Sequence, residues 1–240
     1  PLVTSSALLI DHYELTMLQA ALHSGAAERT SVFELFGRRL PDGRRYGVVA
    51  GVGRMLEELA EFTFGDAELE FLARQKVVDA TTLDYLRDYR FTGSMWGYAE
   101  GEIYFPGSPL LIVESTFAQA CMLETLLLSI YNHDCAIASA ASRMATAAGG
   151  RPLIEMGARR THEQAAVAAA RAAYICGFAT TSNLEAARRY AIPSAGTAAH
   201  SFTLLHDSES DAFTAQLESL GQRTTLLVDT YDVKAAVDLA

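Results

Sequence analysis

The second half of this 240-residue chain alternates between short apolar segments and helix-forming segments, and this alternation restricts the possible folds more than any other feature. The apolar segments read RPLIEMG (151–157), GFATTSN (177–183), IPSAGTA (192–198) and TTLLVDTYD (224–232). Helices are predicted at 162–176, 183–190, 208–220 and from 232 onward. Strands that are apolar on both faces and separated by helices are typical of right-handed βαβ units with a parallel sheet. The four strands could form an open, doubly wound sheet or part of a (β/α)8 barrel.

Polar side chains gather where these predicted strands end. They are Arg159 and Arg160, Ser182 and Asn183, His200 and Ser201, and Asp229 and Thr230. Both candidate architectures place their active sites at the carboxyl ends of parallel strands. We therefore expect a ligand site at this edge of the sheet.

The first half of the chain has a different texture and predicts a mixed α+β unit over residues 1–115. An amphipathic pattern indicates a helix over 11–25, and the alternation of Val32, Glu34 and Phe36 indicates a strand. Further helices are predicted at 53–62, 66–75 and 81–88, strands within 93–116, and a long helix over 117–147. The strand–helix alternation begins only after this long helix.

Charge and cysteine content narrow the class of partner. The net charge of −10 argues against nucleic-acid and anionic-membrane surfaces, which are themselves negative. Cys121, Cys135 and Cys176 lie in apolar stretches without CxxC spacing, which favours reduced, buried thiols and no metal site. No apolar run reaches the ~18–20 residues of a membrane span. We expect a cytoplasmic protein that binds neither nucleic acid nor membrane.

Two consecutive arginines follow the first of the predicted strands. Arg159 and Arg160 stand at the start of a predicted helix, where guanidinium groups and free N–H donors suit phosphate or carboxylate oxygens. The alternative is that one arginine pairs with a nearby acid such as Glu155 or Glu163. A second arginine run, RRLPDGRR (38–45), surrounds a predicted turn and is expected to be a solvated loop.

His200 follows a run of small residues, 194–199, which would let a ligand come close to the backbone before an imidazole. Histidine can act as acid, base or nucleophile near neutral pH, although a structural role is the alternative. No GxSxG, GxGxxG or GxxxxGK[ST] motif is present.

The other strand ends carry residues with two possible roles. Ser182 and Asn183 can contact a ligand or cap the following helix. Asp229 and Asp232 can hold a ribose hydroxyl or Mg²⁺, or can again cap a helix.

Taken together, these segments resemble the nicotinate phosphoribosyltransferase family, in its actinobacterial type. The resemblance covers nearly the whole chain, and its motifs occur in the order expected of the family. They are DHYELTM (11–17), FELFGRRLP (33–41), GEIYFPGSPLLIVE (101–114), ETLLLSIYNHD (124–134), EMGARRTHE (155–163), TTSN (180–183), GTAAHS (196–201) and LLVDTYD (226–232).

The resemblance implies a type II phosphoribosyltransferase fold, with an α+β N-terminal domain over 1–115 and an incomplete, irregular (β/α) barrel over 116–240. It implies condensation of nicotinate with phosphoribosyl pyrophosphate to nicotinate mononucleotide and pyrophosphate. ATP hydrolysis would be coupled through a phosphorylated histidine, with Mg²⁺ assisting. A homodimer with shared active sites is also implied.

The resemblance assigns roles by motif. His200 would be the phosphorylated histidine, Gly196 would line the nicotinate pocket, and Arg159 would anchor nicotinate. Tyr13 would stack on the pyridine ring, reaching into the partner subunit's site. Ser182 stands where nicotinamide-using relatives carry an acid, and its hydroxyl can donate to nicotinate where a carboxylate would repel it. The further substrate contacts would be Thr181, Asn183 and Asp229.

Departures from the family pattern leave alternatives open. Ile10 stands where Thr is expected, and Thr180 where Gly is expected. The strands that complete the barrel in the family would follow LLVDTYD, so we expect the N-terminal portion of an enzyme. A nicotinamide phosphoribosyltransferase is an alternative, which Ser182 opposes. A quinolinate phosphoribosyltransferase is another, which the GTAAHS histidine opposes. A catalytically inactive fragment that binds ligand and dimerises is another.

Overall fold

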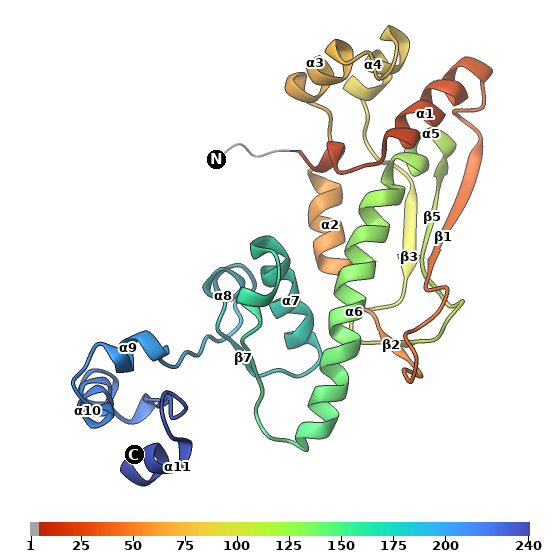
Figure 1. Ribbon diagram of the computed structural model, residues 1–240. Coiled ribbons are helices and arrows are strands. Elements are labelled where there is room, and N and C mark those ends of the chain that lie inside the picture. Colours follow the sequence, from red (N-terminus) through yellow and green to blue (C-terminus); the bar gives the residue numbers. More distant parts are fainter. Residues whose placement is uncertain (1–4) are drawn as a thin grey trace.

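One long helix, α6 (Glu124–Ala148), runs through the middle of the molecule and is contacted by elements from both halves of the chain (Figure 1). The computed structural model describes residues 5–240. The helix ends at Gly149, whose positive φ of 58° lets the backbone turn away. The predicted helix over 117–147 is found in pieces, because α5 (Phe117–Ala120) and a 3₁₀ turn, η2 (Cys121–Leu123), precede α6.

A three-stranded antiparallel sheet lies beside α6. Its central strand, β5 (Pro109–Thr116), pairs with β1 (Thr30–Phe36) on one side and β3 (Ser94–Gly97) on the other. Two shorter strands, β2 (Gly47–Val48) and β4 (Ile103–Tyr104), form a separate antiparallel pair. The strands predicted within 93–116 and around Val32–Phe36 are therefore confirmed.

Helices cover this sheet and extend beyond it. They are η1 (Ser6–Leu8), α1 (His12–Ser24), α2 (Val52–Ala60), α3 (Asp66–Arg74) and α4 (Ala80–Arg87). Each of the predicted helices of the first half is present, within two residues of its expected bounds at either end.

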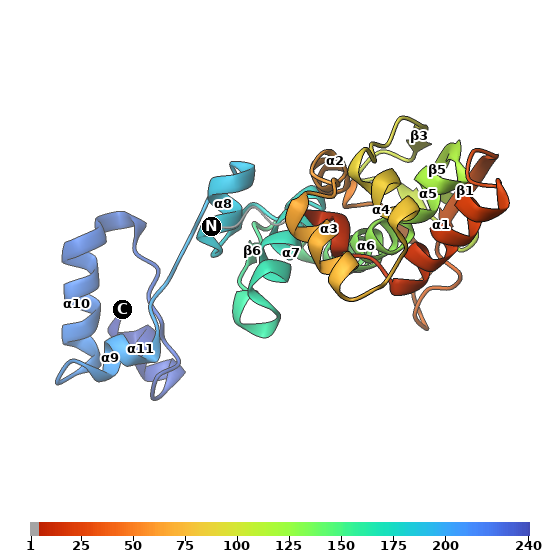
Figure 2. The same cartoon turned by 90° about the horizontal axis from the view of Figure 1, so that it is seen from above.

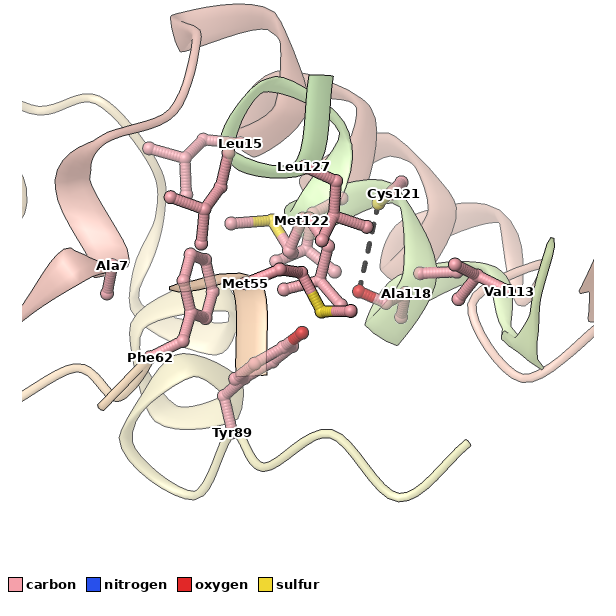
Figure 3. Packing of buried hydrophobic residues seen from close by; sticks show 14 of the residues in the cluster. Ala7, Leu15, Met55, Phe62, Tyr89, Val113, Ala118, Cys121, Met122 and Leu127 are labelled. Carbon is pink, nitrogen blue, oxygen red and sulfur yellow. Dashed lines mark hydrogen bonds between the residues drawn. The ribbon is translucent and has the colours of Figure 1, made fainter. Parts of the chain in front are cut away.

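The main hydrophobic core joins these helices to the start of α6 (Figure 3). Phe62 and Tyr89 meet edge to face with ring centroids 5.6 Å apart, and the Tyr89 hydroxyl donates to the carbonyl of Gln119. Met122 and Leu127 are buried in the same cluster, which extends to Cys135 in α6. The first half of α6 thus packs as part of the N-terminal unit, and the division at residues 115/116 remains a prediction.

The second half contains a smaller parallel sheet than expected. Strand β6 (Ile154–Glu155) pairs with β7 (Thr180–Thr181), and Ser194 adds a single parallel bridge to Thr181. The prediction of a fourth strand over 224–232 is wrong: within residues 5–240 this segment pairs with no strand. A parallel strand is stable only when a neighbour supplies its hydrogen bonds, and this segment lies with the last helices, away from β7 (Figures 1 and 2).

Predicted helices of the second half are present. They are α7 (Glu163–Ile175), α8 (Leu184–Tyr190), α10 (Glu209–Leu220) and α11 (Val233–Leu239). A short helix, α9 (His200–Leu204), and the 3₁₀ turns η3 (Ala158–Arg160) and η4 (Gly221–Arg223) were not expected. In both views α9, α10 and α11 form a separate group beyond α8 (Figure 2). No helix within residues 5–240 is both long and apolar enough to span a membrane.

An ion pair fastens α7 to the N-terminal unit. The guanidinium of Arg171 donates to both oxygens of Glu100 at 2.7 Å, and a Glu100 oxygen also accepts the N–H of Gly51 at 2.8 Å. A Cβ added to Gly53 would lie 2.3 Å from the guanidinium, so only glycine leaves room for this approach. The pair is mostly shielded from solvent, which makes the forked geometry more valuable than at the surface.

A second carboxyl, that of Glu14, is fully buried where α1 meets α6. One oxygen accepts the Thr125 N–H at 2.8 Å, and the other has no hydrogen-bond partner within residues 5–240. Burial raises the pKa of Glu14 to about 7, and the nearby Glu124 and Asp11 carboxylates contribute to the increase.

Ionisation of Glu14 should therefore destabilise the fold. The folded protein keeps this proton up to about pH 7, whereas the unfolded chain loses it near the ordinary pKa of 4.5. The free energy of unfolding therefore falls as pH rises between these two values. Glu14→Gln should raise the free energy of unfolding at pH 8 by about 2 kcal/mol and flatten this slope. Urea denaturation at pH 5 and pH 8 measures both effects. Glu70→Gln, at an exposed position of α3, is the control, and equal slopes in the two variants would contradict the assignment.

Loss of the Arg171 guanidinium should loosen α7. Arg171→Ala leaves Glu100 partly buried without its cation and should lower the free energy of unfolding by about 2 kcal/mol. Arg171→Lys should restore only part of this, because an ammonium cannot engage both carboxylate oxygens as a planar fork. Arg188→Ala removes an exposed pair with Glu185 and should leave the free energy of unfolding nearly unchanged. Equal losses for Arg171→Ala and Arg188→Ala in denaturant titrations would be inconsistent with this account.

Candidate functional site

The carboxyl ends of β6 and β7 lie next to each other, and the loops that follow them carry Arg159 and Ser182. Glu155 of β6 is paired in register with Thr181 of β7. The Ser182 N–H then donates to the Glu155 carbonyl at 2.8 Å. The expectation that Arg159 and Ser182 leave neighbouring strand ends is therefore met.

Arg159 is exposed on η3, directly after β6. Neither Arg159 nor Arg160 forms an ion pair within the described part of the chain, so the alternative of pairing with Glu155 or Glu163 is not observed. The Glu155 carboxylate instead accepts the Gly157 N–H at 2.5 Å and the Thr181 hydroxyl at 2.8 Å. The guanidinium of Arg159 is left available to an anion.

The turn after β7 uses most of its polar groups internally. The Thr181 hydroxyl is buried, donates to Glu155 and accepts the Asn183 N–H at 3.0 Å. The Asn183 side chain accepts the Ala186 N–H at 2.9 Å and so caps α8, as its structural alternative predicted. Ser182 is half-buried, and its hydroxyl makes no hydrogen bond to another residue of 5–240. Of these three consecutive candidates, only Ser182 presents an unengaged side chain.

Thr180, which departs from the family pattern, lies in β7 itself. Its hydroxyl is buried without a hydrogen-bond partner among residues 5–240. The hydroxyl of the added side chain therefore lies inside the protein.

His200 does not lie beside Arg159 and Ser182 in this structure. It is the exposed first residue of α9, and its Nδ1 is 3.3 Å from the Thr230 hydroxyl. Both views place α9 apart from β7, at the end of the small-residue segment (Figures 1 and 2). A Cβ added to Gly196 in this segment would meet nothing within 4 Å. Of the three residues expected to meet, Arg159 and Ser182 follow adjacent strand ends, and His200 does not join them.

The last two candidates lie elsewhere. Asp229 is exposed and precedes Thr230, the partner of His200. Tyr13 stands on α1, where its partly exposed ring directs its hydroxyl to Glu124 at 2.9 Å. This hydrogen bond to a carboxylate, with burial, raises the pKa of the Tyr13 hydroxyl.

A cavity of about 700 Å³ lies in the N-terminal unit, between the arginine-rich loop and α6. Arg38, Arg39 and Arg44 line it together with Tyr131 and Asn132. None of these three arginines forms an ion pair within residues 5–240. The arginine run forms a loop in which Arg38 and Arg39 are exposed, as expected, but the cavity beside it was not predicted. The density of arginines around one turn was the available signal.

Metal ligands are not clustered in the described chain. No group of three or more His, Cys, Asp and Glu side chains in residues 5–240 is arranged to hold a metal ion. Cys121 and Cys135 are buried and Cys176 is half-buried, all as free thiols.

Comparisons with known proteins agree on one family. A family model described as the nicotinate phosphoribosyltransferase (NAPRTase) N-terminal domain matches residues 8–132. A Mycobacterium tuberculosis protein named nicotinate phosphoribosyltransferase pncB1 is 63% identical over 96% of this chain and 53% of its own length. A Bacillus subtilis nicotinate phosphoribosyltransferase is 38% identical over 95% of this chain and 46% of its own length. The chain spans about half the length of these curated relatives.

Solved structures show the same relation. The crystal structure of human nicotinic acid phosphoribosyltransferase superimposes with a TM-score of 0.75 at 33% identity, over 81% of this chain and 40% of that one. The structure of a nicotinate-nucleotide pyrophosphorylase from Pyrococcus furiosus gives a TM-score of 0.78 at 23% identity, over 98% and 54% of the two chains. The second likeness concerns the fold alone.

Proposed function

The chain belongs to the nicotinate phosphoribosyltransferase family, and we propose from this membership that it serves NAD salvage by joining nicotinate to phosphoribosyl pyrophosphate, forming nicotinate mononucleotide and pyrophosphate. The fold class expected from the sequence, a mixed α+β domain followed by part of an irregular (β/α) barrel of the type II phosphoribosyltransferase kind, is confirmed. The observation that carries the functional proposal is the pair of unengaged groups, Arg159 and Ser182, at adjacent strand ends.

Recognition of nicotinate follows from the chemistry of these two groups. An arginine guanidinium can donate two parallel hydrogen bonds to a carboxylate, and Arg159 has no competing acid within residues 5–240. The Ser182 hydroxyl can donate a further hydrogen bond to the same anion. An acid at position 182 would favour an amide and repel a carboxylate, so the serine selects nicotinate over nicotinamide.

The polyanionic co-substrate needs cations that Arg159 alone does not supply. The cavity lined by Arg38, Arg39 and Arg44 offers three guanidinium groups without ion-pair partners in the described chain. We assign this cavity to phosphate groups, because arginine is suited to forked recognition of phosphate oxygens. Tyr13 belongs to the same N-terminal unit, and we assign it to the pyridine ring in the site of a partner subunit within a homodimer.

His200 fits the role of phosphoryl acceptor from ATP. Its imidazole is exposed, and with Nδ1 directed to the Thr230 hydroxyl, Nε2 is left for attack on phosphorus. The Nε2–P bond would form as the bond from the γ-phosphorus to ADP breaks, and water would later release phosphate. Mg²⁺ would neutralise charge on the substrate phosphates. Asp229 directly precedes Thr230, and we assign it to substrate binding in this region.

Ser182 tests substrate choice. In the full-length protein, Ser182→Asp should weaken nicotinate binding at least about tenfold, because a carboxylate faces the substrate carboxylate, while nicotinamide binding is retained or improved. Ser182→Ala, which removes only the donor, should weaken nicotinate binding about threefold. Isothermal titration calorimetry with both ligands measures these affinities. Unchanged nicotinate binding by Ser182→Asp would remove Ser182 from the site.

His200 tests the energy coupling. Incubation of the full-length protein with ATP labelled in the γ-phosphate should give an acid-labile protein label, which His200→Ala reduces to background. His206→Ala is the matched control. His206 lies six residues after His200 and is half-buried, and its Nδ1 is held by the Phe202 carbonyl. Nicotinate binding without any label on the unchanged protein would instead support the alternative of an inactive, ligand-binding module.

A further inference from the structure

Glu155 ties together the two loops that carry Arg159 and Ser182. One carboxylate oxygen accepts the Gly157 N–H at 2.5 Å, and the other accepts the Thr181 hydroxyl at 2.8 Å. The Glu155 carbonyl accepts the Ser182 N–H at 2.8 Å. A single residue at the end of β6 therefore holds both its own turn and the end of β7.

Each link lies close to a candidate ligand contact. The Gly157 carbonyl accepts the Arg160 N–H at 2.8 Å and closes the η3 turn that contains Arg159. Thr181 immediately precedes Ser182. The position of the Glu155 carboxylate thus sets the start of the turn bearing the guanidinium and the residue before the hydroxyl.

In both links Glu155 is the acceptor. A backbone N–H can only donate, and the Thr181 hydroxyl already accepts the Asn183 N–H, so its proton is directed to Glu155. A glutamine at position 155 would turn its NH₂ group toward one of these donors: the Gly157 N–H would then lose its acceptor, or the Thr181 hydroxyl would have to accept where it now donates. Position 157 is matched to this carboxylate, because a Cβ added to Gly157 would lie 2.9 Å from the Glu155 oxygen.

The same links decide what remains for the ligand. An acid four residues before Arg159 could pair with that guanidinium and cancel its charge. Two neutral donors occupy the Glu155 oxygens instead, and no cation is used. Arg159 keeps its forked donors for an anionic ligand.

We propose that Glu155 is a positioning residue, whose carboxylate fixes the spacing between Arg159 and Ser182 by holding Gly157 and Thr181 at once, and so sets the affinity for a pyridine carboxylate. This inference rests on the proposed function for the identity of the ligand. Glu155 itself touches no substrate in this scheme.

The test uses steady-state kinetics and hydrogen exchange on the full-length protein. Glu155→Gln should raise the KM for nicotinate about tenfold and change the KM for phosphoribosyl pyrophosphate by less than about twofold. Thr181→Val should reproduce part of this effect, and Thr181→Ser, which keeps the donor, should recover most of what Thr181→Val loses. In the variant that combines the Glu155 substitution with Thr181→Val, the two increases in the KM for nicotinate should be less than additive, because both substitutions remove the link between these side chains. Glu163→Gln, an exposed acid at the start of α7, is the control for charge alone.

Hydrogen–deuterium exchange gives a readout that needs no ligand. Peptides covering residues 156–160 should exchange faster in Glu155→Met and in Gly157→Ala than in Glu163→Gln, because the link from the Gly157 N–H to a side-chain oxygen at position 155 is lost or strained. Unchanged exchange, or equal increases in both KM values with a lowered Tm, would overturn the positioning role. If the unchanged protein fails to bind nicotinate while exchange responds as expected, the proposed function fails and the Glu155 link stands.

Discussion

The forked pairing of Arg171 with Glu100 determines where the strand ends lie relative to the first half of the chain. Arg171 belongs to α7, which directly links β6 to β7, and Glu100 belongs to the loop before β4. Because the same carboxylate also accepts the Gly51 N–H, the pair joins α7 to the start of α2. A helix fixed in this way also fixes the two strands that it connects, and hence the edge from which Arg159 and Ser182 project.

Three carboxyl groups of this protein occupy environments with different consequences. Glu100 is neutralised by a cation, which fastens two units together. Glu155 is satisfied by two neutral donors, which leaves Arg159 without an internal counter-ion. Glu14 has one donor and an unpartnered oxygen within residues 5–240, and burial therefore raises its pKa. The functional value of an arginine depends on which of these arrangements the nearest acid adopts.

Local sequence patterns predicted the helices, and local motifs carried the resemblance to the family. The same patterns failed where pairing between distant segments decides the structure. α7 and α10 follow from periodicity, which is a local property. Residues 224–232 have the composition of a buried strand, but a strand also needs a neighbour, and no sequence pattern specifies that neighbour. Arg159 and Ser182 were correctly placed at adjacent strand ends, whereas Glu155 was considered only as a partner for an arginine. Its actual donors, Gly157 and Thr181, become apparent only when the register of β6 and β7 is known.

His200 lies apart from the strand ends that carry Arg159 and Ser182. The last backbone link to the sheet is the Ala195 N–H, which donates to the Thr181 carbonyl at 3.0 Å. Beyond it the chain continues through small residues to α9, where His200 is oriented by Thr230 rather than by any residue of β6 or β7. The strand ends that carry Arg159 and Ser182, and the α9–α11 group in which His200 is oriented, are therefore separate parts of the described chain. Neither Glu155 nor Ser182 takes part in the hydrogen bond that orients His200, so under the proposed function phosphorylation and ligand selection should vary independently.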